Sequence, residues 1–431
     1  MTPLNDTVND SLIGTYNPLL PEIQHDPYPY YRAFRDAGIG IHHQLMPDTA
    51  AATRADNHLV AGTTTEFWSV FGYSDVLRIV QDPSTFRSGQ GPGPERALAP
   101  NGVGALVWAD PPAHRIQRSL SNKAFSPRRV TALESRIREI ANEFIDRFAG
   151  TGTADLQADY ADRVPGTINT ELLGISTADQ EKYHDWVLAW VDALAGDEAA
   201  QQRALVASLD FFNYFTEIIG GRRKALDEGK ELPDDLLTAL ITAEVEGESY
   251  DDLTLMLILQ VLITGGEETT SGGIGGGLML LCNHPEQFEL LRRDRSLLPN
   301  AVEEILRYIS PVQAMFRNTS APTTIAGVEI PADSKVRLVY GAANRDPALF
   351  PDPDRFDITR DLRELRGHIA FGGGIHACLG ASMARRMLSI ALDTVLDRLP
   401  GLRVADPAGV TRGDNLTVRR LKNLPMCWDA R

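Results

Sequence analysis

The stretch of sequence that decides the fold is Phe371-Gly-Gly-Gly-Ile-His-Ala-Cys-Leu-Gly380, a glycine-rich loop that leads into an apolar helix expected to begin near Ala381. Cys378 lies just before that helix. Unpaired backbone N–H groups and the positive end of the helix dipole stabilise a thiolate at such a position. We therefore expect Cys378 to bind a metal as its thiolate. The alternative is an inert cysteine in a glycine-rich turn.

The residues around the cysteine suit a flat ligand. Glycines 372–374 allow a tight turn, and Gly380 removes a side chain where a flat macrocycle would press against the helix. Phe371 is expected to shield the sulfur from water. Phe371, His376 and Gly380 at these spacings favour the ligand interpretation over the inert one.

The composition is that of an ordinary globular protein, with 431 residues, 43% hydrophobic and 23% charged. A net charge of −16 disfavours nucleic acid as a partner, because such binding relies on Lys and Arg. The longest apolar stretch, residues 253–263, is too short to span a bilayer, so we expect no membrane anchor. The chain has no CxxC spacing, which argues against a zinc or disulfide framework and fits a reducing cytoplasm: the three cysteines are Cys282, Cys378 and Cys427.

The pattern of the chain is mainly helical. Residues 68–71 read as a strand, followed by a short helix through residues 76–80. Residues 252–282 are apolar almost all round and predict one long helix. That helix contains a glycine run at residues 272–277, and each interior glycine costs about 0.5–1 kcal/mol relative to alanine. Either another backbone or a flat ligand approaches closely there, or the hydrogen-bond ladder opens locally.

Two loops stand out. Residues 88–104 carry too many glycines and prolines for a regular element, and a long loop inside a compact domain is more often functional than accidental. Residues 43–65 form an extension to which the sequence assigns no function.

The glycine loop resembles the haem-ligand signature Phe-Gly-x-Gly-x-His-x-Cys-x-Gly of the cytochrome P-450 superfamily, and matches every fixed position of it. The resemblance extends from about residue 18 to the C-terminus. It implies a mainly α fold with a small β region, in which a single triangular domain carries a long central helix over the haem. Residues 1–17 are then a flexible tail, and residues 18–431 are the catalytic domain.

The resemblance implies that the cofactor is haem b (iron protoporphyrin IX) and that Cys378 binds its iron. His114 and Arg118 match the family's pair one helical turn apart that binds a haem propionate. Arg317 and His376 match further propionate partners, because a guanidinium suits a carboxylate. The alternative for these four residues is separate surface charges.

Three further residues match a structural network of the family. Glu304 and Arg307 lie three residues apart, where a carboxylate and a guanidinium meet on one helix face. Arg355 is implied as the third member. The role of this network would be folding and haem retention, whereas an ordinary surface ion pair is the alternative.

Glu268 and Thr269 match the acid–alcohol pair of the family's central helix, and Gly266 before them would leave room for dioxygen. Splitting an O–O bond needs protons, which a hydroxyl backed by a carboxylate can relay. Two neighbours depart from the commonest family pattern. Gly265 stands where alanine is frequent, and Glu267 is a second acid directly before Glu268.

The implied function is monooxygenation of a hydrophobic small molecule, with electrons from NAD(P)H delivered by a ferredoxin and a ferredoxin reductase. Basic residues near the helices that flank the cysteine side are a candidate dock for an acidic ferredoxin: Arg115, Lys123, Arg128, Arg129, Arg385 and Arg386. Three alternatives stay open. They are a peroxygenase that uses H₂O₂, a non-catalytic haem-binding sensor, and a protein without haem.

Overall fold

The computed structural model describes residues 3–45, 60–62, 66–91, 93, 96–97, 104–125, 131–193 and 198–430. The chain divides into two compact units, which are described separately. The first contains residues 1–110, 289–378 and 412–419, and the second contains residues 111–288, 379–411 and 420–431. Within the described residues, no helix is long and apolar enough to cross a membrane.

The first unit is built on a mixed five-stranded sheet in the order β1-β3-β10-β7-β4. Its strands are β1 (Ile41–Leu45), β3 (Glu66–Val70), β10 (Lys335–Leu338), β7 (Met315–Thr319) and β4 (Phe86–Arg87). Only β3 and β10 pair in parallel, with Val336 opposite Trp68. Two small antiparallel pairs accompany this sheet: β2 (Val60–Gly62) with β5 (Arg96–Ala97), and β8 (Thr323–Ile325) with β9 (Val328–Ile330).

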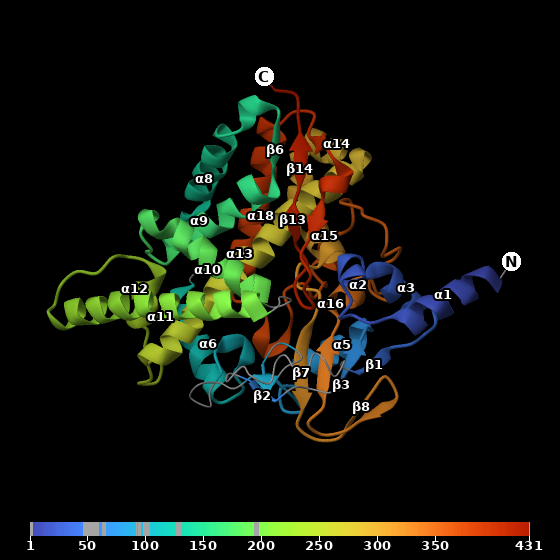
Figure 1. The fold of residues 1–431 in the computed structure, drawn as a ribbon, viewed down its shortest axis with the longest axis horizontal. Helices are drawn as coiled ribbons and strands as arrows, with labels where there is room; N and C mark the ends of the chain where they lie inside the picture. The colour runs from blue at the N-terminus through green and yellow to red at the C-terminus, as the bar shows by residue number, and fades with distance from the viewer. Residues whose placement is uncertain are drawn as a thin grey trace. The chain divides into compact units, whose positions relative to one another are not determined.

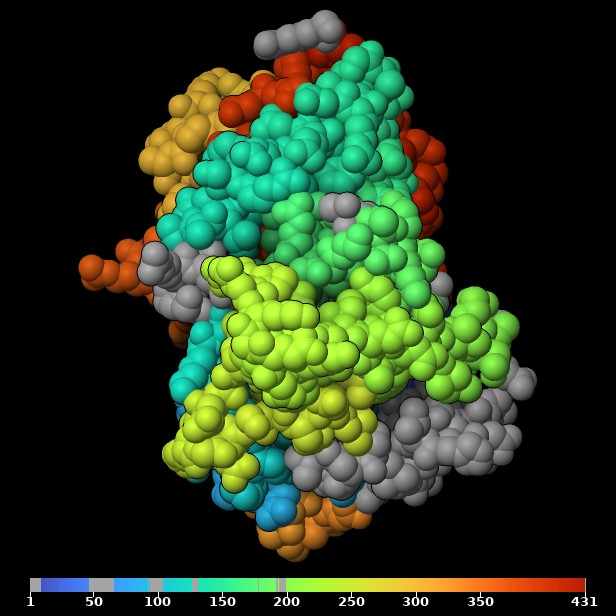
Figure 2. All heavy atoms as spheres, turned by 90° about the vertical axis from the view of Figure 1, so that its left-hand side faces the viewer, coloured from blue at the N-terminus to red at the C-terminus, as the bar shows by residue number. Residues whose placement is uncertain are grey.

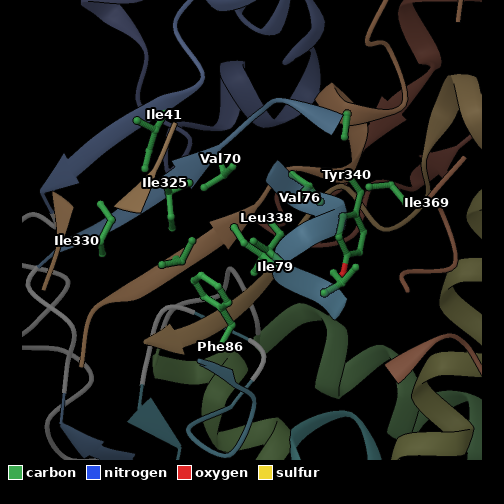
Figure 3. Packing of buried hydrophobic residues seen from close by; sticks show 13 residues of the cluster. Ile41, Val70, Val76, Ile79, Phe86, Ile325, Ile330, Leu338, Tyr340 and Ile369 are labelled. Atoms are coloured by element: carbon green, nitrogen blue, oxygen red, sulfur yellow. The ribbon is translucent and has the colours of Figure 1, made fainter. Parts of the chain in front are cut away.

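Helix α5 (Tyr73–Gln81) packs on this sheet and closes its core (Figure 3). The side chains of Val76 and Ile79 on α5 point toward Val70 and Leu338 on the strands, and all four are almost completely buried. The strand and the short helix predicted from residues 68–80 are therefore confirmed. This core matters for the site because the Cys378 loop packs against Val80 at the end of the same helix.

Further helices of the first unit precede β1, lie between β5 and β7, or follow β10 along the chain. They are α1 (Pro3–Thr15), α2 (Pro21–His25), α3 (Tyr28–Asp36), η1 (Leu106–Trp108), η5 (Arg295–Leu297), α15 (Leu298–Ile309), α16 (Tyr340–Ala343), α17 (Leu362–Leu365) and η6 (Gly374–His376). Tyr16, directly after α1, is buried against Phe34 and Phe71. The division at residue 17 into a tail and a catalytic domain stays a prediction.

The second unit is mainly helical (Figure 1). Its helices are α6 (Ala113–Ala124), α8 (Glu134–Asp146), η2 (Ala149–Thr151), η3 (Gln157–Ala161), α9 (Arg163–Leu172), η4 (Thr177–Asp179), α10 (Gln180–Ala193), α11 (Glu198–Asp227), α12 (Leu236–Ile241), α13 (Asp252–Asn283), α18 (Ala381–Arg398) and η7 (Pro407–Gly409). Helix α14 (Pro285–Arg293) crosses the boundary between the units. Short strands of this unit form one three-stranded sheet, β11 (Arg403–Val404), β14 (Pro425–Cys427) and β6 (Thr153–Asp155). Strand β13 (Leu421–Asn423) pairs with β12 (Thr411–Arg412), whose two residues fall on either side of the unit boundary. The mainly α class with a small β region is confirmed.

Helix α13 is the long helix that the sequence predicts at residues 252–282. It packs against α9, α10 and α18 within the second unit (Figure 1). Its glycine run is explained by close packing. A Cβ atom on Gly273 would lie 3.0 Å from a methyl carbon of Leu388 on α18, and one on Gly275 would overlap the side-chain oxygen of Gln157 in η3. The run therefore serves the approach of neighbouring elements.

Helices α10 and α11 lie on one face of the second unit (Figure 2). Their aromatic side chains pack on one another, with ring centroids 5.5 Å apart for Trp186 and Phe211 and 5.3 Å for Trp190 and Phe211. Each indole N–H has a partner, Asp210 for Trp186 and Ser208 for Trp190. The aromatic residues of this region therefore form a packed helix pair.

Two glycines of α13 provide a matched test of this packing. We expect Gly275→Ala to lower the free energy of unfolding by about 1–3 kcal/mol, because the added methyl group displaces the hydrogen-bonded Gln157. The methyl group of Gly265→Ala meets no atom of the described residues within 4 Å, so we expect this substitution to raise the free energy of unfolding by about 0.5–1 kcal/mol. Urea unfolding monitored by circular dichroism measures both. Equal effects of the two substitutions would contradict this account.

Candidate active site

The Cys378 loop is held in a tight, left-handed turn in the first unit. Gly372 and Gly374 have φ angles of +66° and +60°, which a side chain rarely adopts. A Cβ on Gly374 would also overlap the carbonyl oxygen of Val80. The Cys378 N–H donates to the carbonyl of Phe371 at 2.9 Å, which closes the loop, and the Cys378 side chain is exposed. The sequence therefore presents a thiol on a rigid turn.

Helix α18 begins three residues after Cys378, as predicted. Gly380 is its N-cap and offers no side chain to the first N–H groups. In the described part of the chain, no atom lies within 4 Å of where a Gly380 Cβ would be. The start of α18 thus has both open space and the positive end of a helix dipole.

Arg317 and His376, the two predicted propionate partners of the first unit, differ in their surroundings. Arg317 lies on β7, is 4% exposed and donates from Nη1 to the carbonyl of Phe316 at 2.7 Å. Among the described residues, no carboxylate pairs with its guanidinium, although a buried cation needs an anion. The His376 Nε2 lies 3.1 Å from the Ser88 hydroxyl. The Cys378 thiol and the buried guanidinium of Arg317, both in the first unit, fit an anionic iron porphyrin.

In the second unit, α6 carries His114 and Arg118 one turn apart. His114 is 3% exposed and Arg118 is partly exposed. A buried imidazole and a guanidinium on one helix face can together bind a carboxylate. Their assignment to a haem propionate stays a prediction.

The predicted acid–alcohol pair lies on α13. The Thr269 hydroxyl donates to the carbonyl of Gly265 at 2.7 Å, which leaves its oxygen able to accept a hydrogen bond. Glu268 is 3% exposed, and its Oε1 has no hydrogen-bond partner among the described residues. Burial raises the pKa of Glu268 to about 7, with Arg420 opposing and Glu267 and Asp162 adding to the rise. Glu268 can therefore both give and take a proton near neutral pH.

Gly266 lies where α13 packs closely against α9. A Cβ at Gly266 would lie 2.9 Å from Nδ2 of Asn169 on α9, so the missing side chain is needed for helix packing. The assignment of Gly266 to a space for dioxygen stays a prediction. The neighbouring Gly265 is exposed and faces open space instead.

The pair Glu304–Arg307 lies on α15, and both side chains have 0% exposure. Arg307 makes two hydrogen bonds to the carboxylate, of 2.6 and 2.8 Å, and also donates to the carbonyls of Asn344 and Pro353 at 2.9 Å each. Every charge in this cluster is thus matched by a hydrogen bond. The pair belongs to the interior of the first unit, not to its surface.

The third member of this network is Arg360, and this corrects the prediction of Arg355. The Arg360 Nε lies 3.3 Å from the Glu304 carboxylate, whereas the Arg355 side chain is 62% exposed and approaches Asp357. Arg355 contributes only its carbonyl oxygen, which accepts from Arg307 at 3.3 Å. The reason is geometric, because the turn after residue 352 directs the Arg355 side chain to solvent.

Phe371 is partly buried, and its ring lies 6.0 Å from that of His368. His368 is itself buried and lies 3.0 Å from Glu303. The sequence analysis did not identify this His368–Glu303 pair, and it had no motif to find it by. Its position beside the start of the Cys378 loop makes it part of the loop's support.

The candidate ferredoxin dock is less basic than its sequence suggests. Arg115 forms a bidentate ion pair with Glu246, and Arg386 lies 3.2 Å from Glu134. The Lys123 ammonium donates to the carbonyl of Glu244. Residues 128 and 129 lie outside the described residues, as do most of the loop after residue 91 and most of the 43–65 extension.

Comparisons with known proteins agree with this fold. The family model for cytochrome P450 matches residues 59–400. The monooxygenase PikC of Streptomyces venezuelae is 34% identical over 94% of this chain and 91% of its own length, and 6-deoxyerythronolide B hydroxylase of Saccharopolyspora erythraea is 38% identical over 74% and 77%. The solved structure of CYP109Q5 from Chondromyces apiculatus covers 96% of this chain and 98% of its own, with a TM-score of 0.80 and 32% identity.

The fold and the thiol loop define a haem-dependent oxidoreductase. The chain belongs to the cytochrome P450 family. It is a P450 monooxygenase, and the family implies a haem, a small-molecule substrate and redox partners.

Breaking the buried Glu304 pair should be costly. We expect Arg307→Leu to lower the free energy of unfolding by about 3–5 kcal/mol, because it leaves the Glu304 charge buried without its main partner. Arg360→Leu should cost about 1–3 kcal/mol, and the exposed Arg355→Leu less than about 0.5 kcal/mol. Chemical denaturation of the purified variants measures these values. If Arg355→Leu lowered the free energy of unfolding as much as Arg360→Leu does, the prediction that Arg355 is the third member of the network would stand.

The raised pKa of Glu268 predicts a specific pH dependence. Below the ordinary carboxyl pKa of 4.5 the group is protonated in both states, so it has no effect on stability. As pH rises from 4.5 to about 7, only the unfolded chain releases the proton, and the folded state loses stability by up to about 3 kcal/mol. Glu268→Gln should therefore gain stability relative to the wild type across this window. A difference that does not change with pH would contradict the prediction.

Proposed function

We propose that this P450 binds haem b with Cys378 as the iron ligand and inserts one oxygen atom into an apolar small molecule. The observation that carries the proposal is the exposed Cys378 thiol on a rigid glycine turn directly before helix α18. A helix N-terminus favours the thiolate form of such a side chain. Arg317 and His376 in the first unit, with His114 and Arg118 in the second, are the proposed partners of the haem propionates.

When bound, the haem activates dioxygen so that one atom enters the substrate and the other leaves as water. The chain's own contribution is proton delivery. The Thr269 hydroxyl donates to the Gly265 carbonyl and keeps its lone pairs for a water or a reacting oxygen. Glu268, with a pKa near 7, supplies the proton, and the Thr269 hydroxyl accepts a hydrogen bond from the water that carries it.

The substrate class and electron source belong to the same proposal. Several relatives are named as hydroxylases or epoxidases of natural products such as 6-deoxyerythronolide B, which supports an apolar substrate. Electrons from NAD(P)H would arrive through a ferredoxin and its reductase in the cytoplasm. Arg115 and Arg386 already form ion pairs with Glu246 and Glu134. Charge attraction to an acidic ferredoxin is therefore weaker than it would be if all six basic side chains had no acidic neighbour.

An oxidant comparison separates the monooxygenase from the remaining alternatives. Product formed with NADPH, ferredoxin and reductase, in proportion to the NADPH consumed, supports the proposal. Turnover with H₂O₂ but not with the electron-transfer proteins would establish a peroxygenase. No oxidation with either system across a substrate panel would favour a haem-binding sensor.

The ligand itself is tested by the absorption spectrum of the dithionite-reduced protein under carbon monoxide. We expect a strongly red-shifted Soret band in the wild type and its loss in Cys378→Ala, because only a thiolate ligand gives that shift. Cys282→Ala is the matched control and should keep the band, since Cys282 is a half-buried cysteine on α13. A band that is indifferent to Cys378, or a colourless wild type, would overturn the proposal.

A further inference from the structure

A cluster of buried polar groups surrounds Glu268 in the second unit. It holds three carboxyl groups, from Glu267, Glu268 and Asp162, and two basic side chains, from His184 and Arg420. The three carboxyls are each less than a tenth exposed. An enzyme has little reason to bury so many acids for stability alone, because each one costs free energy unless it is paired.

One side of the cluster is closed. Asp162 Oδ1 accepts hydrogen bonds from Gln157, Ser271 and Arg420, at 2.7 Å from the Gln157 amide and 3.2 Å from the guanidinium. Gln157 also donates to the Ser271 hydroxyl at 2.7 Å. With its donors committed in this way, the Asp162 side is a fixed support and not a route for protons.

The other side of the cluster leads toward solvent. His184 on α10 places its Nδ1 2.8 Å from Oε1 of Glu267, and its side chain is 15% exposed whereas that of Glu267 is 3% exposed. Gly166 on α9 makes room for this carboxyl, since a Cβ there would lie 3.3 Å from its Cδ. His184 is thus the member of the pair that water can reach.

Two carboxyl oxygens in the cluster are left open. Glu267 Oε2 and Glu268 Oε1 are both buried without a hydrogen-bond partner in the described part of the chain. Such oxygens are costly unless a proton or a bridging water meets them. They belong to successive residues of α13, so the second acid that departs from the family pattern lies next to the predicted catalytic one.

We propose that His184 and Glu267 form a solvent-linked branch that resupplies Glu268 with protons during turnover. The His184 Nδ1–H gives its proton to Glu267 Oε1, and the ring takes a replacement from water. The Glu267 carboxyl, now carrying this proton on Oε1, rotates and passes it to Glu268 through a bridging water, after Glu268 has released its own proton toward Thr269. Once the His184 ring has taken up its replacement proton and both side chains have rotated back, every group has returned to its starting state. This inference rests on the role proposed for Glu268.

The charges around the pair suit this transfer. Burial lowers the pKa of His184, but the hydrogen bond and charge of Glu267 outweigh it and the net direction is upward. Burial raises the pKa of Glu267, with His184 opposing. Both groups therefore hold a proton more strongly than they would in water, which keeps a transferable proton within the hydrogen-bonded pair. The other charged or titratable groups facing the pair are Arg163, Asp162, Arg420 and Tyr183.

The first experiment is an infrared pH titration of the resting protein without substrate. We expect His184→Gln to add a second protonated carboxyl signal at neutral pH, because Glu267 then lacks its cation and takes up a proton. The double variant His184→Gln/Glu267→Gln should lack that signal. An unchanged carboxyl spectrum in His184→Gln would overturn the coupling between the two residues.

The second experiment measures turnover with the electron-transfer proteins. We expect Glu267→Gln and His184→Gln to lower product formed per NADPH by about tenfold, with H₂O₂ released instead, and to flatten the pH profile of coupling. Glu181→Gln is the matched control, because Glu181 lies on α10 as well but is 77% exposed and paired with Arg163. The carbon monoxide spectrum verifies that each variant folds and retains haem.

The outcomes distinguish the two proposals. Normal coupling in Glu268→Gln would remove the acid role from the proposed function. Impaired coupling in Glu268→Gln, with wild-type coupling in Glu267→Gln and His184→Gln, would overturn only the supply branch. If Glu267→Gln fails to retain haem, the coupling of His184→Gln alone tests the supply branch. His184 lies on the solvent side of the pair, so its substitution leaves the packing of helix α13 unchanged.

Discussion

The ion pair between Glu304 and Arg307 is the interaction on which the first unit depends. A guanidinium with no exposure must satisfy all its donors, so Arg307 fixes the carbonyl of Asn344 as well as the carboxylate. The Asn344 side chain in turn accepts from the N–H of Ile369, whose carbonyl accepts from Gly372. An unbroken chain of hydrogen bonds therefore connects the pair to the turn that presents Cys378.

The buried charges of the first and second units differ in how completely they are hydrogen-bonded. Around Arg307 each donor and acceptor is matched, which favours rigidity. On α13 the carboxyl oxygens Glu267 Oε2 and Glu268 Oε1 are left open, and the folded state bears the cost. A buried charged group whose donors and acceptors are all hydrogen-bonded suits a structural role. One with an open oxygen suits a group that must exchange protons. The contrast separates structural acids from candidate catalytic ones without reference to any motif.

The sequence predicted what depends on local pattern. The long helix at 252–282 and the helix beginning near Ala381 each match the structure to within a residue or two, because apolar periodicity and the residues at helix ends are local signals. The sequence-based prediction was wrong where two arginines could each have supplied the side chain that contacts Glu304. Arg355 and Arg360 both lie in one irregular segment, and only the backbone turn decides which side chain reaches Glu304.

Contacts between residues distant in the sequence were also not predicted, because they depend on glycines that let two helices approach closely. Glu267 and His184 are 83 residues apart, and no spacing rule links them. Their contact exists because Gly166 on α9 leaves space for the Glu267 carboxyl, while Gly266 on α13 leaves space for Asn169. Each missing side chain costs helix stability but lets α9 and α13 approach closely. That approach excludes water from the acids and raises their pKa values, so the backbone packing itself produces the acid chemistry of this helix.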